Sequence, residues 1–197
     1  DPVPAIFLGS SEVSVKEMVG AFSIYANKGV YNAPMMVTKI EDKYGNVLAN
    51  FYPESREVIT ENTAFLMANL LQGVVDEGTG RRLRFRYGFK NQIGGKTGTT
   101  QNHSDGWFIG ITPDLAGGVW VGAEDRSIHF QNLANGQGAS MALPIWALFM
   151  QKVYADKSLA VPQSDFQKPN GVNHVLDCGD ADREGMMDYD SSDEIFD

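Results

Sequence analysis

The stretch from residue 92 to residue 122 constrains the fold of this chain most strongly. Three short runs of strand-forming residues follow one another at close spacing, namely Gln92–Thr100, Asp105–Pro113 and Gly117–Gly122, and turn residues separate them. Because such short connections usually join neighbouring antiparallel strands, the stretch predicts an antiparallel meander. The first run is unusual, since glycine weakens a strand interior and often marks a place where another backbone or a ligand comes close.

Lys96 lies in this first run among glycines and hydroxyl residues. Its neighbours are Gly94, Gly95, Thr97, Gly98, Thr99 and Thr100. An extended backbone can pair with a peptide, threonine hydroxyls can donate to a carboxylate, and Lys96 supplies a positive charge. The run therefore predicts a site for an anionic, peptide-like ligand. The alternative is a solvated edge strand with a lysine that guards against aggregation and threonines that favour β structure.

Three helices are expected around the meander. Ser14 and Glu17 form a capping box ahead of an apolar pattern with helical spacing. Thr60 caps a second such pattern, which ends at a glycine stop. Ala139–Tyr154 is apolar enough for a helix that lies across a sheet.

A β-hairpin is expected between the first two helices. Residues 35–40 and 47–52 form two strand-like runs, and they flank the turn residues 42–46. Together with the meander and the helices, this hairpin predicts an α+β fold in which an antiparallel sheet is flanked by helices.

Length and composition predict one domain followed by a tail. The 197 residues suffice for a single core, which we expect in residues 1–162. Residues 163–197 are expected to form an acidic, disordered tail, since their last part carries nine acids against one arginine and few apolar residues. The single cysteine, Cys178, excludes an internal disulfide framework. The formal net charge of -9 argues against a nucleic-acid partner, and no run is long enough for a membrane span.

Two charged features outside Lys96 each have two interpretations. The first is a basic cluster that consists of Arg81, Arg82, Arg84 and Arg86. It either steers an anionic ligand toward Lys96 or, as we favour, pairs with nearby carboxylates. The second is His103 beside Asp105, where a solvated histidine and an aspartate with a turn role are favoured over an acid-base pair.

Several segments together resemble the penicillin-binding proteins. They are Lys96–Thr100, Asp105–Gly110, Thr112–Leu115 and Gly118–Gly122. Lys-Thr-Gly is the third motif of that family and of class A β-lactamases. The double threonine, the segment Gln72–Arg81 and the segment Leu8–Val13 are similar to the class A, bifunctional peptidoglycan synthases. The resemblance runs from about Val3 to about Met150.

Two motifs of the family are missing from this chain. No lysine has a serine three positions before it, and no asparagine has a serine two positions before it. The family's Ser-x-x-Lys and Ser-x-Asn motifs are therefore absent, and in the family order both precede the Leu8–Val13 segment. We expect this chain to be the C-terminal part of a penicillin-binding-protein/β-lactamase-like transpeptidase domain, inactive by itself. The remainder of the parent polypeptide would then be its partner.

The resemblance implies a mechanism and a set of roles. In the family, a serine attacks a D-alanyl-D-alanine stem peptide, releases the last alanine and passes the acyl group to an amine. By this resemblance Lys96 holds the substrate carboxylate and a proton network, and Thr97 and Thr99 bind the carboxylate of stem peptides or β-lactams. The backbone N–H of Thr99 completes the oxyanion hole, Gly98 keeps the strand open, and Thr100 belongs to the substrate-binding set. No metal or cofactor is implied.

The resemblance also implies a location and leaves two alternatives open. The parent would act on the extracytoplasmic side, anchored in the inner membrane by a preceding segment, and would also carry a glycosyltransferase domain. One alternative is a non-catalytic module that binds peptidoglycan or a partner protein through the same strand. The other is a relative of the serine β-lactamases or D,D-carboxypeptidases.

Overall fold

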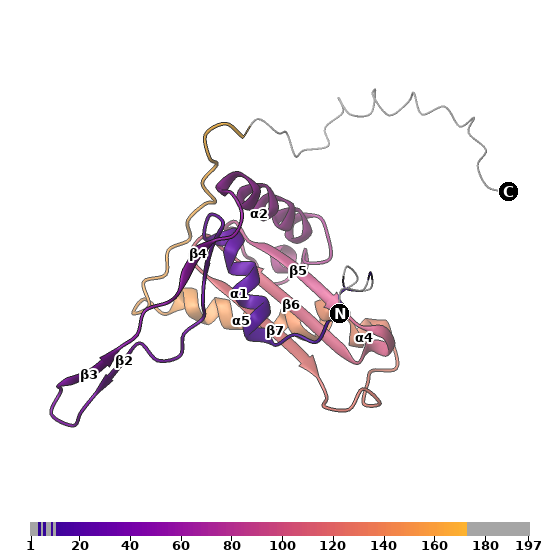
Figure 1. Ribbon diagram of the computed structural model, residues 1–197. Coiled ribbons are helices and arrows are strands. Elements are labelled where there is room, and N and C mark those ends of the chain that lie inside the picture. Colours follow the sequence, from indigo (N-terminus) through magenta and orange to yellow (C-terminus); the bar gives the residue numbers. More distant parts are fainter. Residues whose placement is uncertain (1–3, 5, 7–8, 10, 173–197) are drawn as a thin grey trace.

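The computed structural model describes residues 4, 6, 9 and 11–172 (Figure 1). Its helices are α1 (Val15–Ala26), α2 (Glu61–Asp76), α3 (Arg82–Phe85), α4 (Leu133–Gly136) and α5 (Gly138–Ala155). Its strands are β1 (Val30–Asn32), β2 (Lys39–Glu41), β3 (Val47–Asn50), β4 (Ser55–Glu57), β5 (Gly94–Thr99), β6 (Asp105–Ile111) and β7 (Ala116–Gly122). A short 3₁₀ segment, Gln101–His103, connects β5 to β6.

The sheet β5-β6-β7 is the centre of the fold. Its strands are antiparallel and lie in chain order, with Lys96 opposite Ile109 and Ile109 opposite Gly118. Thr112 closes the turn between β6 and β7, because its hydroxyl accepts the N–H of Leu115 at 3.0 Å. The predicted meander is confirmed, and so is the α+β fold with an antiparallel sheet flanked by helices.

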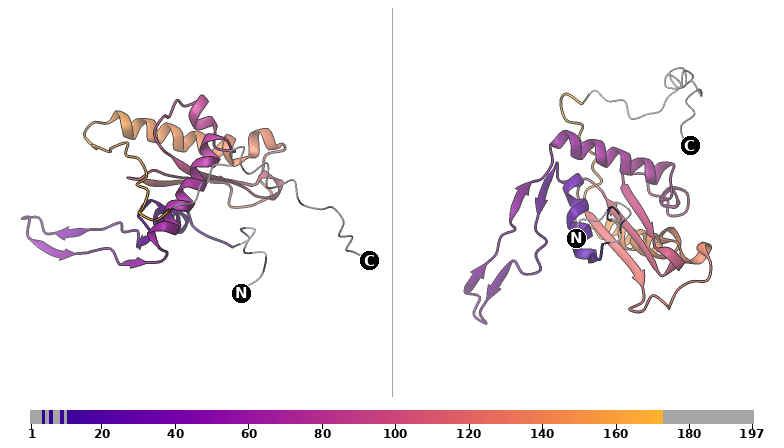
Figure 2. Two further views of the ribbon diagram at one scale, coloured as in Figure 1. Left: turned by 90° about the horizontal axis from the view of Figure 1, so that it is seen from above. Right: turned by 45° about the vertical axis from the view of Figure 1, so that its right-hand side comes forward.

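Helices cover both faces of this sheet (Figures 1 and 2). On one face α5 brings Trp146 against Phe108 of β6, with ring centroids 5.3 Å apart and planes at 70°. On the other face Val19 of α1 lies beside Gly118 of β7. Gly110 allows α5 to pack this close to the sheet, because a Cβ at this position would lie 2.5 Å from the Trp146 ring.

The first strand of the sheet is covered by α2 only at its beginning. Leu71 lies next to Gly94, and Val75 lies next to Gly95. From Lys96 onward the residues of β5 are exposed or half-buried. The buried start of β5 therefore belongs to the core, and the rest of the strand lies at the surface.

The predicted helix caps are confirmed. Glu17 accepts the backbone N–H of Ser14 at 2.8 Å, and the hydroxyl of Ser14 accepts the N–H of Glu17 at 3.2 Å. At α2 the hydroxyl of Thr60 accepts the N–H of Thr63 at 3.2 Å. Each cap satisfies donors that the first helical turn leaves unpaired.

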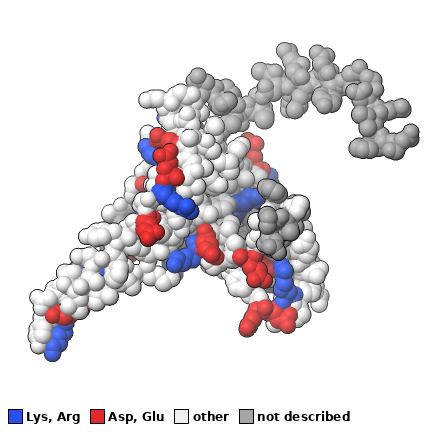
Figure 3. Space-filling model, in the orientation of Figure 1, with Lys and Arg blue, Asp and Glu red and all other residues white. Residues whose placement is uncertain are grey.

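The predicted hairpin is also confirmed, and it projects from the body as an arm, which we define as residues 35–52 (Figures 1 and 2). In its turn Asp42 accepts the N–H groups of Tyr44 and Asn46 at 2.8 and 2.9 Å. Many apolar side chains of the arm are exposed, with Met36 at 87% and Tyr52 at 81%. The charged side chains of the arm gather near its tip (Figure 3).

Two parts of the fold were not predicted. β1 and β4 pair at the base of the arm, where Val30 lies opposite Glu57. The single-turn helices α3 and α4 are too short to give an apolar period in the sequence. Both features depend on contacts between segments that lie apart in the chain.

Residues 163–172 lie against the domain. The N–H of Phe166 donates to Oε1 of Gln92 at 2.8 Å, and the hydroxyl of Ser164 donates to Asp114 at 3.2 Å. Val172 is buried. These contacts extend the packed body past residue 162. The acidic segment from Asp177 to Asp197 lies outside the described residues, so its predicted disorder stays a prediction.

Candidate functional site

The outer edge of β5 is the candidate site. Within the described residues β5 pairs only with β6. The N–H of Thr100 donates to the carbonyl of Asp105 at 3.2 Å, so the amide of Thr100 points toward β6. Since the pairing of an antiparallel strand alternates along the chain, the N–H and carbonyl of Thr97 and of Thr99 point to the outer edge. This edge can therefore accept an extended peptide.

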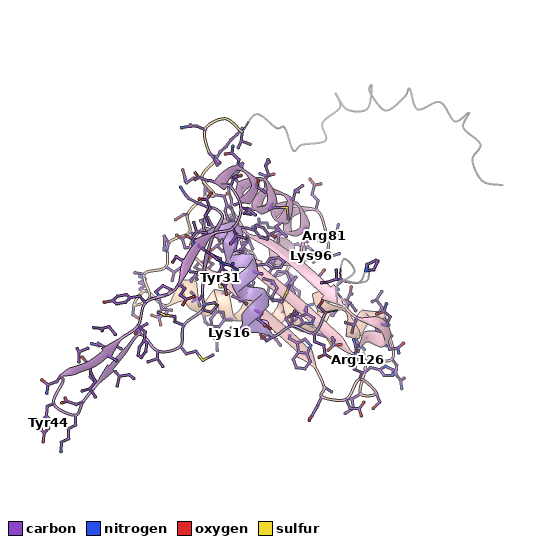
Figure 4. The ribbon with its side chains drawn as sticks, in the orientation of Figure 1. Lys16, Tyr31, Tyr44, Arg81, Lys96 and Arg126 are labelled. Atoms are coloured by element: carbon purple, nitrogen blue, oxygen red, sulfur yellow. The ribbon has the colours of Figure 1, made fainter. Side chains whose placement is uncertain are left out.

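Lys96 places a cation at that edge. Its Nζ donates to the carbonyl oxygen of Thr97 at 2.8 Å, which holds the ammonium beside the outward-facing backbone (Figure 4). The ion pairs between described residues do not include Lys96. The charge is thus available to an incoming anion.

Thr97 and Thr99 each have a hydroxyl that is held by another segment. The hydroxyl of Thr97 lies 2.7 Å from the hydroxyl of Thr79, which precedes α3. The hydroxyl of Thr99 accepts the N–H of Gly138, the first residue of α5, at 3.0 Å. A hydroxyl that accepts a hydrogen bond still has its own proton to donate. Thr99 can therefore donate to a carboxylate at the edge without losing its internal partner.

Thr100 is placed differently from the other two threonines. Its hydroxyl donates to Asp105 at 2.8 Å and accepts the N–H of the same residue at 3.1 Å. The hydroxyl oxygen of Ser104 lies 3.0 Å from the hydroxyl oxygen of Thr100. These bonds give Thr100 a role in the turn between β5 and β6.

Asp105 is the centre of that turn. Its carboxylate accepts hydrogen bonds from Nε1 of Trp120 at 2.9 Å and from Arg126 at 3.2 Å, besides those from Thr100 and Ser104. Burial raises the pKa of Asp105, but the hydrogen bonds that stabilise the carboxylate outweigh burial and hold the pKa below its ordinary value. The predicted turn role for Asp105 agrees with this geometry.

His103 does not form an acid-base pair with Asp105 among the described hydrogen bonds. Its backbone is left-handed, with φ 58°, and its Nδ1 is buried without a partner among the described residues. It lines a pocket of about 280 Å³ together with Val121, Phe130 and Met141. The prediction of a solvated histidine is therefore wrong, because His103 is half-buried in the wall of this pocket.

The arginine cluster divides into structural members and exposed members. Arg84 pairs with Asp76 at 2.6 Å and donates to two backbone carbonyls. Arg82 donates to the carbonyl of Ala139 at 2.8 Å and to Ser140 at 2.9 Å. The favoured interpretation, pairing with a carboxylate, therefore holds for Arg84, but it is wrong for Arg82, which binds a backbone carbonyl and a hydroxyl instead. Arg81 is exposed and is labelled near Lys96 in the view of Figure 4.

Thr79 is a neighbour of the candidate site that sequence reasoning missed. The segment around it resembled the family, but nothing in a Gly-Thr-Gly triplet says that its hydroxyl meets Thr97, 18 residues further on. The same holds for Gly138, whose N–H reaches Thr99 from 39 residues away. Both contacts arise because α2, β5 and α5 pack together, and spacing along the chain does not reveal them.

Within the described residues, no three His, Cys, Asp or Glu side chains come together in a way that could hold a metal ion. The helices of the described part also include none that is long and apolar enough to span a membrane.

The comparison with known protein families gives the class of this protein. A sequence profile described as "Penicillin binding protein transpeptidase domain" matches residues 7–138. The chain therefore belongs to the penicillin-binding-protein transpeptidase family.

Two relatives within this family show how large a part of a longer protein the chain matches. Penicillin-binding protein 1A of Aquifex aeolicus is 33% identical over 168 residues, which are 85% of this chain and 22% of that protein. Penicillin-binding protein 2D of Bacillus subtilis is 32% identical over 180 residues, which are 88% of this chain and 24% of that protein. The chain thus spans less than a quarter of each of these relatives.

A solved structure supports the fold. The crystal structure of penicillin-binding protein 1A from Haemophilus influenzae matches with a TM-score of 0.74, over 86% of this chain and 30% of that chain. The two sequences are 24% identical over this match. The similarity supports the arrangement of the sheet and its helices.

Proposed function

We propose that this chain is the C-terminal part of a serine D,D-transpeptidase that cross-links peptidoglycan stem peptides and binds β-lactams. The remainder of a longer polypeptide supplies the serine nucleophile, because this chain has no Ser-x-x-Lys motif. That polypeptide is anchored in the inner membrane, works on its extracytoplasmic side and also carries a glycosyltransferase domain. The stem peptide, or a β-lactam in its place, is the ligand of the β5 edge.

The reaction assigns a task to each group at the edge. The serine oxygen attacks the carbonyl carbon of the penultimate D-alanine, the peptide C–N bond breaks, and the last D-alanine leaves with a proton on its nitrogen. The acyl group then passes from the serine to the amine of a neighbouring stem peptide. In both steps the N–H of Thr99 donates to the developing oxyanion, a kind of contact worth on the order of 3 kcal/mol.

Recognition of the terminal carboxylate belongs to three side chains. The Lys96 ammonium attracts the carboxylate, and the hydroxyls of Thr97 and Thr99 donate to it. Gly98 lies against Trp107, where a Cβ would be 3.0 Å from the Cβ of Trp107, and its lack of a side chain keeps the strand open to the ligand. Thr100 supports the turn and contributes to the site through that turn.

One observation carries this proposal. The hydroxyl of Thr99 already accepts the N–H of Gly138 at 3.0 Å, at an edge where the backbone of Thr99 points outward. The hydroxyl oxygen is therefore held in place before any ligand arrives, and its proton is still free to donate. Preorganised donors of this kind are effective in catalysis because they need no reorganisation during the reaction.

Labelling with a fluorescent penicillin tests the proposal. We would compare this chain with the longer polypeptide that includes the serine-bearing segment, each as wild type and as Lys96→Ala. We expect covalent label only on the longer polypeptide, and a labelling rate at least about tenfold lower for Lys96→Ala. Lys39→Ala is the matched control, since Lys39 is an exposed lysine of the arm that pairs with Glu41.

The other outcomes are equally informative. Label on the short chain would mean that its nucleophile is one of its own serines, and the role given to the longer polypeptide would be wrong. If neither polypeptide is labelled, a non-catalytic binding module that uses the same strand becomes the better explanation. Equal labelling of the Lys96→Ala and Lys39→Ala variants would remove Lys96 from the site.

A further inference from the structure

The loop Gly78–Gly80, which we call the Thr79 loop, has no role in the function proposed above. It connects α2 to α3 and places the hydroxyl of Thr79 2.7 Å from the hydroxyl of Thr97 on β5. Thr79 is exposed at the surface of the protein. A side chain that contributes little to the core but meets a ligand-binding group at short distance invites a functional explanation.

The loop is held rigidly against the end of α2. The N–H of Gly80 donates to the carbonyl of Val74 at 2.9 Å, and that of Gly78 donates to Gly73 at 3.1 Å. A Cβ at Gly78 would lie 2.9 Å from the carbonyl oxygen of Val74, so only glycine permits this approach.

The residues that follow the loop fix it from the other side. Leu83 is fully buried, Arg82 donates to the backbone of the distant residue Ala139, and Arg84 donates to the backbone of Asn91, seven residues further on. Arg82 reaches the carbonyl of Ala139, which lies one residue after Gly138, the partner of Thr99. The same packing thus positions the partners of both Thr97 and Thr99.

The direction of the bond between the two hydroxyls decides what Thr97 can do. Either oxygen can be the donor. When Thr79 donates, Thr97 accepts and keeps its own proton for a ligand, as Thr99 does beside Gly138. When Thr97 donates to Thr79, it has no proton left for a carboxylate. A carboxylate at the edge favours the first arrangement, because it can only accept.

We propose that Thr79 is a positioning residue, which donates to the hydroxyl of Thr97 and thereby turns the Thr97 proton toward the carboxylate of the bound peptide or β-lactam. This inference rests on the proposed function, since it concerns the same edge of β5. It gives the Thr79 loop a purpose in recognising the carboxylate, without contact between Thr79 and the reacting atoms.

Acylation kinetics of the longer polypeptide test this inference. The second-order rate constant would be measured with a fluorescent penicillin and with its neutral methyl ester, for wild type, Thr79→Val and Thr79→Ser. Valine keeps the shape of threonine without the hydroxyl, and serine keeps the hydroxyl. We expect Thr79→Val to slow acylation by the acid about five- to tenfold, as for the loss of a hydrogen bond between two uncharged groups. Acylation by the ester should change less than about twofold, and Thr79→Ser should restore the wild-type rate with the acid.

Three results would overturn the inference. One is Thr79→Val reacting with the acid at the wild-type rate. Another is an equal loss with acid and ester, because a structural defect would slow both. The third is Thr79→Ser reacting as slowly as Thr79→Val. Thermal unfolding of each variant, measured alongside, shows whether the domain is still folded. A wild-type polypeptide that penicillin does not acylate would instead contradict the proposed function itself, so the two failures are distinguishable.

Discussion

The central sheet and the arm are both built from antiparallel strands joined by short turns, yet their surroundings differ completely. Phe108 of β6 is fully buried beneath α5, whereas Leu48 of β3 is 66% exposed. The sheet is rich in glycine because helices lie close to it, and the arm has apolar side chains without a cover among the described residues. A strand pattern therefore predicts a strand, but the elements packed on it decide how much each residue contributes to stability.

The largest expected difference between the two regions comes from their aromatic residues. Trp146→Ala removes the side chain that fills the space between α5 and β6, and we expect a loss of about 3 to 5 kcal/mol in the free energy of unfolding. Tyr52→Ala in the arm should change it by less than about 0.5 kcal/mol, because Tyr52 is largely exposed. Urea unfolding of both variants measures the difference. Similar losses would mean that the arm is packed in solution.

A second comparison replaces one glycine in each region, and the expected loss of stability has a different cause in each. Gly110→Ala would push a Cβ into the Trp146 ring, and we expect a loss of about 2 kcal/mol in the free energy of unfolding, measured in urea. Gly45 in the turn of the arm has φ 86°, and no atom of the described residues lies within 4 Å of the place that a Cβ would take, so only its backbone conformation matters. Gly45→Asn should cost less than about 0.5 kcal/mol, since asparagine tolerates the left-handed region. A harmless Gly110→Ala would mean that α5 can move away from the sheet.

Two turn carboxylates provide the finest comparison. Asp105 in the sheet and Asp42 in the arm both have a pKa below the ordinary value; for Asp42 the side chain and backbone N–H of Asn46 are the main cause. A lowered pKa means that the ionised carboxylate stabilises the fold at pH values above its pKa in the unfolded chain, about 3.9. This stabilisation is lost as the pH falls through the pKa of the folded protein. Asp105→Asn should therefore cost about 1 to 2 kcal/mol near pH 7. Wild type and variant should converge in strong acid.

Thermal unfolding from about pH 7 to about pH 2 measures this effect for Asp105→Asn and Asp42→Asn. The Asp42 variant should show the smaller change, because Asp42 lies on the exposed arm where water replaces lost hydrogen bonds. A difference between wild type and Asp105→Asn that persists unchanged at the acid end would show that the carboxylate charge is not its cause.

Much of the fold was predictable because its signals are local. The capping box at Ser14, the cap at Thr60 and the turn at Asp42 each involve residues within four positions of one another. The pairing of β1 with β4 was not predictable in the same way. Each of these strands has three residues, and only their encounter at the base of the arm makes them strands.

The candidate site shows the same division. Lys96, Thr97 and Thr99 were identifiable because they lie within one motif, and the resemblance to a family gave that motif a meaning. Thr100 belongs to the same motif, but the structure places its hydroxyl in the turn with Asp105. Neighbouring threonines thus have different roles. Successive side chains of a strand point to opposite faces, and Thr100 follows the last residue of β5.

The sequence by itself determined the order of strands in the meander, the helix ends and the residues of the β5 edge, since each depends on neighbours in the chain. Tertiary structure alone decided which groups hold the hydroxyls of that edge in place. Thr79 precedes β5 in the chain and Gly138 follows it, and their bonds to Thr97 and Thr99 exist because α2 and α5 pack on one sheet. A hydrogen bond acts over about 3 Å, and only packing brings such distant residues within that range.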